Sequence, residues 1–284
     1  MNELSLFTGA GGGLLGTHLL GWRPVGYVEW NEYCQRVIAA RIADGYLPAA
    51  PIFTDVREFV QSGAAEQYRG IADVVTGGFP CQPFSVAGKQ QAADDERNMW
   101  PATRDVIRIV QPASVLLENV PGLISCGYLG TVIADLAALG YVGQWGVIGA
   151  ADAGAPHRRD RLWIMAHAKS VQRDGSKHYG FRYLEGAREN FGRLCESGNG
   201  SDCADVANSD GIRSSGSWWA FDPGDSAPSG DREINRTFYE SRWGIESRMG
   251  RVANGVAYRV DRLKAIGNGQ VPAVVARAWR ELAA

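Results

Sequence analysis

The chain has 284 residues, of which 45% are hydrophobic and 21% are charged, and its formal net charge is −2. This composition is typical of a soluble globular protein with one large core and a smaller lobe. No apolar run reaches the ~18 residues of a membrane-spanning helix, and the start MNELSLFTG lacks the basic region and apolar core of a secretory signal. Five cysteines without CxxC spacing favour reduced thiols in a cytoplasmic compartment. The balanced charge gives no global attraction to nucleic acid, but it leaves room for a local basic groove.

Short apolar runs alternate with helical patterns over residues 1–167. The predicted strands are Leu4–Phe7, Pro24–Trp30, Ala72–Gly78, Ala113–Val120 and Arg161–Ala166, and the clearest helices between them are Asn31–Ile42 and Asn98–Val110. Strands that alternate with helices indicate an α/β fold with a mostly parallel sheet and helices on both faces. In such sheets the functional groups gather at the carboxyl ends of the strands.

The composition changes over residues 168–250, where branched aliphatic residues become sparse and Gly, Ser, Asp and Arg dominate. Composition alone would also fit a disordered linker. Aromatic residues recur there, however, including the pair Trp218 and Trp219, so we expect a small loop-rich lobe. Residues 251–284 regain aliphatic spacing, and VPAVVARAWREL predicts a closing helix with Pro272 at its start. We therefore expect a catalytic and cofactor-binding domain at 1–167, a lobe at 168–250, and a segment at 251–284 that returns to the first domain.

A glycine cluster joins the first strand to a helix in LSLFTGAGGGLLGTHLL. It fails the phosphate-loop pattern, because Thr17 stands where lysine is required, and it fails GxGxxG, because Leu14 replaces the third glycine. The loop still predicts a small anionic or nucleoside ligand at a helix N-terminus. Glu29, which ends the next strand, suits ribose hydroxyls, and Trp30 offers a flat face for an adenine ring. A tight turn without a ligand is the alternative.

The stretch GGFPCQPFS holds Cys81 between two prolines at the end of a predicted strand. A buried inert thiol is the common fate of a free cysteine, but the rigid prolines and the polar Gln82 and Ser85 are unusual company for one. The zinc deaminase pattern PCxxC also fails, because Phe84 replaces its second cysteine. We therefore predict that Cys81 is a nucleophile.

Two further polar elements follow central strands. Glu118 ends SVLLENV, where a carboxylate is costly unless it is used. Arg159 and Arg161 in PHRRDRLWIM alternate into a strand, which predicts that both side chains lie on one face. Guanidinium groups there suit an electron-rich carbonyl or a phosphate. A thiolate and a carboxylate on neighbouring strand ends can act on one substrate from two sides.

In this order, FTGAGG, GFPCQPFS, ENV, the RxR of HRRDR and GNGQVP resemble the cytosine carbon-5 DNA methyltransferase family of bacterial or phage type. The resemblance covers Leu4–Ala166 and Arg251–Trp279. It implies the S-adenosylmethionine-dependent methyltransferase fold, a Rossmann-like sheet, with target recognition in the 168–250 lobe. Two residues depart from the family pattern: His157 replaces the usual glutamine before RxR, and Gln270 replaces a small or apolar residue in the last motif.

The resemblance also implies the chemistry of a cytosine flipped out of DNA. The Cys81 thiolate would attack carbon 6 of the base, Glu118 would hold or protonate ring nitrogen 3, and Arg161 would bind the carbonyl at carbon 2. Arg159 would support Arg161 or contact the backbone. The expected substrate-binding residues are Gln82, Ser85 and Asn119. The expected cofactor-binding residues are Phe7, Gly9, Ala10, Gly11, Gly12, Glu29, Trp30, Asp55, Val56, Gly78, Pro80, Asn268 and Gly269. No metal site is expected, since the other cysteines match no zinc spacing.

These expectations point to methyl transfer to double-stranded DNA by a monomer in the cytoplasm of a bacterium or a phage-infected host, without a membrane partner. The chain would be the modification half of a restriction system, with a separate cognate endonuclease, or a solitary enzyme. Transfer RNA as substrate, as in a related branch, is the second hypothesis. A non-enzymatic DNA-binding relative is disfavoured because Cys81 and Glu118 are present. A nicotinamide oxidoreductase is disfavoured by the broken GxGxxG.

Overall fold

The computed structural model describes residues 1–80, 98–169, 181–183 and 259–283. The strands are β1 (Asn2–Leu6), β2 (Arg23–Val28), β3 (Ile52–Phe53), β4 (Val74–Gly77), β5 (Ser114–Asn119), β6 (Tyr141–Ile148), β7 (Arg161–Ala168) and β8 (Phe181–Tyr183). The helices are α1 (Gly12–His18), α2 (Glu32–Ala43), α3 (Val56–Gln61), α4 (Trp100–Val110), α5 (Gly122–Ser125), α6 (Tyr128–Ala138), α10 (Arg259–Asn268) and α11 (Pro272–Leu282). Two short 3₁₀ turns, η1 (Ala64–Tyr68) and η2 (Ala151–Ala153), complete these parts of the chain. The predicted lobe at 168–250 and the segment that begins at Cys81 lie almost wholly outside the described residues.

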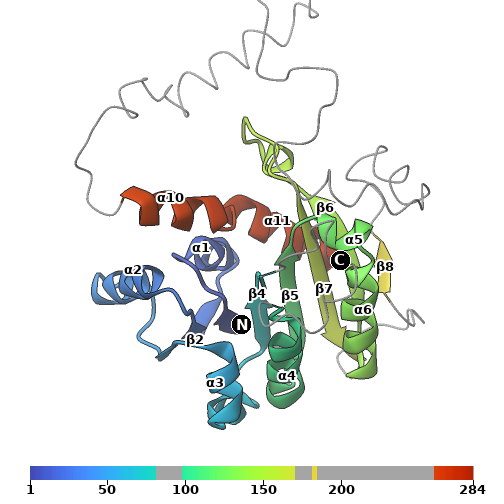
Figure 1. Cartoon of the computed structure of the whole chain (residues 1–284), viewed down its shortest axis with the longest axis horizontal. Coiled ribbons are helices and arrows are strands. Elements are labelled where there is room, and N and C mark those ends of the chain that lie inside the picture. Colours follow the sequence, from blue (N-terminus) through green and yellow to red (C-terminus); the bar gives the residue numbers. More distant parts are fainter. Residues whose placement is uncertain (81–97, 170–180, 184–258, 284) are drawn as a thin grey trace, which may run out of the picture.

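The described strands form one sheet in the order β3-β2-β1-β4-β5-β7-β6-β8 (Figure 1). Strands β1 to β5 are parallel, β7 is antiparallel to both β5 and β6, and β8 pairs in parallel with β6. The prediction of an α/β fold with a mostly parallel sheet is confirmed. Because β7 is reversed, its first residues lie beside the last residues of β5.

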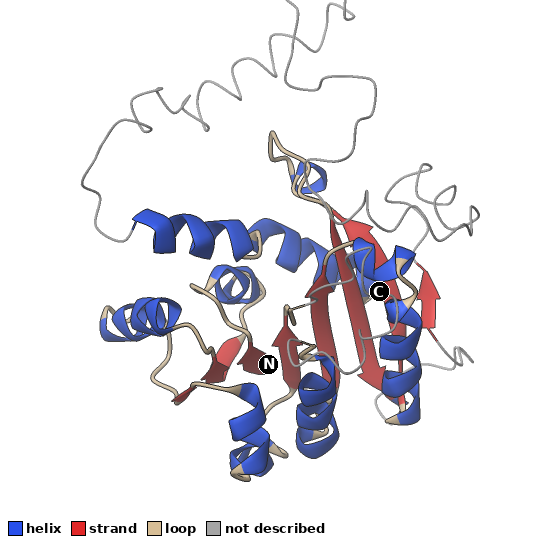
Figure 2. Cartoon of the chain, viewed as in Figure 1, coloured by secondary structure: helices blue, strands red, loops and turns tan. Residues whose placement is uncertain are grey.

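Helices cover both faces of this sheet (Figure 2). Side chains alternate along β4, so Val75 packs in one core with α3, α4 and α6, whereas Val74 packs in a second core with α11. The same alternation divides Val115 from Leu116 on β5. A strand that is buried on both faces has a continuous apolar sequence, and for this reason β4 and β5 could be predicted from the sequence.

Two parts of the architecture were not predicted. Strand β6 has the sequence YVGQWGVI, in which two glycines and a glutamine interrupt the apolar pattern. Helix α6 precedes it and buries Leu129, Val132 and Leu136, at helical spacing, against the first core. Strand β1 also begins earlier than predicted, at Asn2, so that Glu3 lies within it.

Among the described residues, no helix is both long enough and apolar enough to cross a membrane.

The C-terminal segment returns to the sheet through a very close contact between α1 and α11. A Cβ atom built on Gly16 would lie 2.6 Å from Cβ of Val275 and 2.7 Å from the carbonyl oxygen of Pro272. Such distances are far inside van der Waals contact, so only glycine fits at this crossing. The edge-on stacking of Trp22 and Trp279, with ring centroids 4.5 Å apart, fixes the other end of α11.

This packing predicts opposite effects for two helical glycines. Gly16→Ala should lower the free energy of unfolding by about 1–3 kcal/mol, because the added methyl group meets α11. Gly130→Ala, in α6, is the matched control: its Cβ would have no heavy atom within 4 Å, so the better helix propensity of alanine should raise stability by about 0.5–1 kcal/mol. Urea denaturation of both variants measures the two values, and equal stabilisation would contradict the described contact.

Candidate active site

The residues predicted to be functional follow strands along one edge of the sheet. In spatial order, the edge carries Asp55 after β3, Glu29 after β2, Phe7 after β1, Gly78 after β4 and Asn119 at the end of β5. Strand β7 is antiparallel, so its first residue, rather than its last, lies at this edge. The ends of the five parallel strands and the start of β7 therefore meet at one edge of the sheet. Ligands bind at this edge in open α/β sheets.

The glycine cluster forms a tight turn with a buried carboxylate beneath it. Gly9 and Gly11 have left-handed backbones, with φ of 58° and 91°. Glu29 accepts hydrogen bonds from the backbone N–H groups of Gly9, at 2.6 Å, and Asn31, at 2.8 Å. Glu29, which was predicted to bind ribose, thus also fixes the loop, and each oxygen retains a lone pair for a further donor.

The neighbouring cofactor candidates differ in exposure. Trp30 is 77% exposed, so its ring is free to stack on a ligand. Val56 is buried in the first core, which leaves only its backbone to face a ligand. The Asp55 carboxylate accepts from the backbone N–H of Arg57 at 2.7 Å and pairs with its guanidinium at 2.8 Å. Hydrogen bonding to Arg57 lowers the pKa of Asp55, so this group stays ionised.

Glu118 lies at the centre of the edge and is held at both oxygens. Arg161 donates from Nε to Oε1 at 2.9 Å, and the side-chain amide of Gln270 donates to Oε2 at 3.5 Å. Burial raises the pKa of the Glu118 carboxyl, and the two arginines and Gln270 counter that rise only in part. The carboxyl group is therefore easier to protonate than an exposed glutamate.

Arg159 lies elsewhere than predicted. The expectation that Arg159 and Arg161 alternate within one strand is wrong, because β7 begins only at Arg161 and Arg159 has a left-handed backbone with φ of 40°. Its guanidinium donates to the carbonyl oxygens of Gly267 and Gly269, both at 2.6 Å. Arg159 thus ties the turn between α10 and α11 to the sheet edge, and burial lowers its pKa.

Asn119 supports the chain that leads toward Cys81. Its buried amide donates to the carbonyl oxygen of Phe79 at 3.0 Å, and its oxygen accepts from the N–H of Val120 at 2.8 Å. The Phe79 ring packs on Trp100, with centroids 5.3 Å apart. The description ends at the exposed Pro80, so Cys81, and with it the predicted Gln82 and Ser85, lies outside the described residues.

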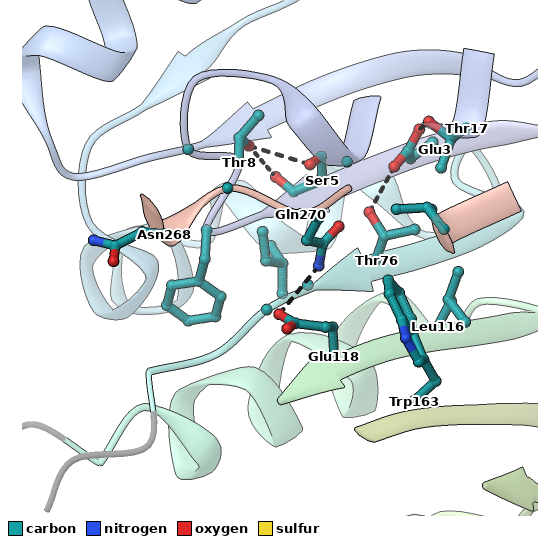
Figure 3. A pocket seen from close by; sticks show the side chains of 18 residues that line it. Glu3, Ser5, Thr8, Thr17, Thr76, Leu116, Glu118, Trp163, Asn268 and Gln270 are labelled. Atoms are coloured by element: carbon teal, nitrogen blue, oxygen red, sulfur yellow. Dashed lines mark hydrogen bonds between the residues drawn. The ribbon is translucent and has the colours of Figure 1, made fainter. Parts of the chain in front are cut away.

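A cleft that is partly open to solvent lies between this edge and the C-terminal turn (Figure 3). The predicted residues that line it are Phe7, Gly9, Gly78, Glu118, Asn268 and Gly269. Those that do not line it are Ala10, Gly11, Gly12, Glu29, Trp30, Asp55, Val56, Pro80, Asn119, Arg159 and Arg161. Gly12 has a different neighbour from the one expected: a Cβ there would lie 2.5 Å from the carbonyl oxygen of Gln270. Among the described residues, no cluster of His, Cys, Asp and Glu is able to hold a metal ion.

Comparison with known families identifies the chain. Residues 1–219 match the family of C-5 cytosine-specific DNA methylases. The chain belongs to this family. It is 36% identical over 167 residues to the type II methyltransferase M.NgoMIV of Neisseria gonorrhoeae, which covers 58% of this chain and 51% of the relative. It is 32% identical over 175 residues to M.HpaII of Haemophilus parainfluenzae, which covers 59% and 46%.

The methylase fold is also seen in solved structures. A mutant of Spodoptera frugiperda DNMT2 superposes with a TM-score of 0.51 at 18% identity, covering 64% of this chain and 54% of that one. The chain spans about half the length of the curated methylases that it matches.

One polar group at the cleft was not predicted from the sequence. Glu3, which is 1% exposed, forms part of the cleft lining and accepts hydrogen bonds from the hydroxyls of Thr17, at 2.5 Å, and Thr76, at 2.6 Å. Burial raises the pKa of Glu3 to about 7, against these two bonds. Side chains alternate along ELSL, so Glu3 and Ser5 lie on the cleft face. The predicted strand began at Leu4, and this alternation was therefore not recognised.

The raised pKa makes stability depend on pH. The folded protein retains the Glu3 proton at pH values where the unfolded chain has lost it, so the stability that this proton contributes is full at low pH and disappears as pH rises through about 7. Glu3→Gln cannot ionise. From pH ~5 to pH ~8, the wild type should therefore lose about 3 kcal/mol of unfolding free energy relative to this variant.

Urea denaturation across that pH range measures the difference. The exposed Glu66→Gln is the matched control and should follow the wild-type curve. Parallel curves for the wild type and Glu3→Gln would show that Glu3 is not protonated in the folded protein near neutral pH.

Proposed function

We propose that this chain is a DNA (cytosine-5-)-methyltransferase that uses S-adenosylmethionine. The observation that carries the proposal is the Glu118 carboxyl group, held by Arg161 at the strand edge from which the chain continues to Cys81. Family membership supplies the reaction class, and this geometry brings the expected acid and the expected carbonyl-binding arginine within 2.9 Å of each other.

The residues at the cleft fit S-adenosylmethionine, which the family uses. A Cβ on Gly9 would meet no atom within 4 Å, so the left-handed turn leaves open space beside its backbone. The buried Glu29 carboxylate and the exposed Trp30 ring, which lie outside the cleft lining, suit a ribose and an adenine. Asn268 and Gly269 line the cleft itself. When bound, the cofactor supplies an electrophilic methyl group.

Each side chain of the site has a defined task in this proposal. The Cys81 thiolate adds to carbon 6 of a flipped cytosine, which makes carbon 5 nucleophilic. Glu118, whose pKa burial raises, donates a proton to ring nitrogen 3 as electrons move into the ring. Arg161 gives up part of its contact with Glu118 and donates a hydrogen bond to the ring carbonyl instead. Arg159 keeps its hydrogen bonds to the C-terminal segment. After methyl transfer a water molecule acting as base takes the carbon-5 proton, the thiolate leaves carbon 6, and ring nitrogen 3 returns its proton to Glu118.

The proposal extends to the partners. The 168–250 segment would read a short sequence of double-stranded DNA, and a cognate endonuclease would act as a separate protein. The designation of the relatives as type II methyltransferases supports a modification enzyme of a restriction system over a solitary one. A monomer in the bacterial or phage-infected cytoplasm is the expected form, because one chain is sufficient to flip one base.

Methyl transfer to DNA is the direct test. With labelled S-adenosylmethionine and unmethylated plasmid, we expect incorporation at cytosines in one short context, mapped by bisulfite sequencing. Cys81→Ser should abolish it, because the weaker hydroxyl nucleophile cannot replace the thiolate. Cys126→Ser, which alters a thiol directed at the Leu123 carbonyl away from the cleft, is the matched control and should keep full activity.

The same assay separates the rival substrates. Incorporation into transfer RNA but not into plasmid would overturn the proposed substrate and retain the chemistry. Equal incorporation by the wild type and Cys81→Ser would overturn the covalent mechanism. A folded wild-type chain that binds the cofactor but transfers no methyl group to either nucleic acid would overturn the proposed function.

The aromatic platform gives a second prediction. Trp30→Ala should weaken S-adenosylmethionine binding by roughly five- to a hundredfold, which corresponds to the ~1–3 kcal/mol of one base–aromatic stacking contact. Isothermal titration calorimetry measures the affinity. Tyr46→Ala removes another aromatic ring that is 71% exposed and should leave it unchanged. Unaltered binding by Trp30→Ala would place the adenine elsewhere.

A further inference from the structure

Gln270 occupies the turn between α10 and α11 and reaches into the centre of the cleft. Figure 3 shows its side chain directed at Glu118, to which Nε2 donates at 3.5 Å. Three glycines make room for it. A Cβ on Gly12 would lie 2.5 Å from the Gln270 carbonyl oxygen, and one on Gly78 would lie 3.1 Å from Nε2. A Cβ on Gly13 would overlap Oε1. The amide therefore has a fitted place between the glycine turn and the carboxyl group.

The two oxygens of Glu118 have chemically different partners. Oε1 faces the guanidinium of Arg161 at 2.9 Å, which is a charged group that only donates. Oε2 faces the neutral amide of Gln270 at the longer distance of 3.5 Å. A proton added to Oε1 would oppose the arginine donor, so protonation favours Oε2. The protonated Oε2 then needs an acceptor where the amide now donates.

Glutamine is able to meet this need, because its side chain carries both a donor and an acceptor. The terminal torsion of glutamine is broad and roughly two-fold, so exchanging Nε2 for Oε1 costs little. The backbone of Gln270 meanwhile remains fixed, because Arg159 donates to the carbonyls of Gly267, at the end of α10, and of Gly269, directly before Gln270. An arginine or lysine in this place would satisfy only the ionised carboxylate, and an apolar residue would satisfy neither state.

We propose that Gln270 is a positioning residue that follows the protonation of Glu118, donating to the carboxylate and accepting from the carboxylic acid. The inference rests on the proposed function, in which Glu118 alternates between these two forms. The charged groups that face Glu118 in the described structure are Arg161, at the start of β7, and Arg159, in the turn before it. Gln270 is thus the group that adapts, while both arginines stay cationic donors.

Two variants test this role. Gln270→Leu keeps the volume and removes both hydrogen-bonding functions, and Gln270→Glu keeps the shape but places a second acid beside Glu118. We expect kcat for methyl transfer to fall about five- to tenfold in Gln270→Leu, the effect of one lost hydrogen bond, while KM for the cofactor changes less. The exposed Arg280→Gln, on the same segment, should retain wild-type values.

The pH dependence distinguishes positioning from mere space filling. The hydrogen bond from the amide to the ionised carboxylate is stronger than the one that it accepts from the neutral acid, so the amide lowers the pKa of Glu118 on balance. Its removal should therefore move the alkaline limb of the kcat profile to higher pH. The limb should move further in Gln270→Glu, because like charges raise the pKa of the pair. A space-filling residue would lower kcat equally at every pH.

A titration without substrate tests the contact itself. Carbon-13 NMR of the glutamate carboxyls in the free protein, with Glu118 assigned by comparison with Glu118→Gln, should show a higher midpoint for Glu118 in Gln270→Leu than in wild type. An unchanged midpoint together with unchanged kcat in an active protein would overturn the role of Gln270. A wild type that methylates no nucleic acid would instead overturn the proposed function, and the NMR midpoint would still decide whether the amide acts on Glu118.

Discussion

The close approach of α1 to the C-terminal segment is the constraint on which the site depends. Gly12, Gly13 and Gly16 all face that segment, and added Cβ atoms would collide with Gln270, Pro272 and Val275. A larger residue at Gly12 or Gly16 would meet the backbone of Gln270 or Pro272 and lift the turn that carries Asn268 and Gln270 away from the sheet edge, whereas one at Gly13 would displace the Gln270 side chain. The glycine cluster thus has two roles. Gly9 leaves open space beside the cleft, and Gly12 and Gly16 allow the C-terminal segment to pack closely against α1.

The reversed strand β7 adds the second half of the site. In a sheet with only parallel strands, a residue at the start of a strand would lie at the opposite edge from Glu118. The antiparallel pairing of β5 with β7 sets Glu118 against Trp163, so Arg161, two residues earlier, projects at the carboxyl edge. An ion pair between residues 43 positions apart then requires no long loop to bring the two groups together. Arg159, just outside the strand, is left to bind the C-terminal turn.

The sequence predicted the parallel core well, because its strands are buried on both faces and read as apolar runs between glycine and acidic residues. The resemblance led us to expect that Glu118 and Arg161 bind one base; their side chains lie 2.9 Å apart, and the shared role stays a prediction. It could not predict β6, whose glycines break the pattern, nor the direction of β7, because strand direction depends on the whole connection. The hydrogen bonds of Arg159 and Gln270 escaped for the same reason: both join segments more than a hundred residues apart, and local patterns carry no information on such pairs.

Two carboxyl groups line the cleft, the buried Glu3 and the partly buried Glu118, and they differ in their partners. Burial raises the pKa of Glu3 to about 7, and within the described part of the chain the hydroxyls of Thr17 and Thr76 and the charge of the N-terminus oppose this rise. Burial also raises the pKa of Glu118, but the positive charges of Arg161 and Arg159 oppose that rise. A carboxyl group that both donates and accepts a proton in catalysis must be able to reach its ionised and its protonated form. In the proposed reaction, Arg161 on one oxygen of Glu118 and the adaptable Gln270 amide on the other support both forms. The hydroxyl-bound Glu3 instead links β1 to α1 and β4, so in the proposed reaction Glu118 is the carboxyl group that transfers the proton.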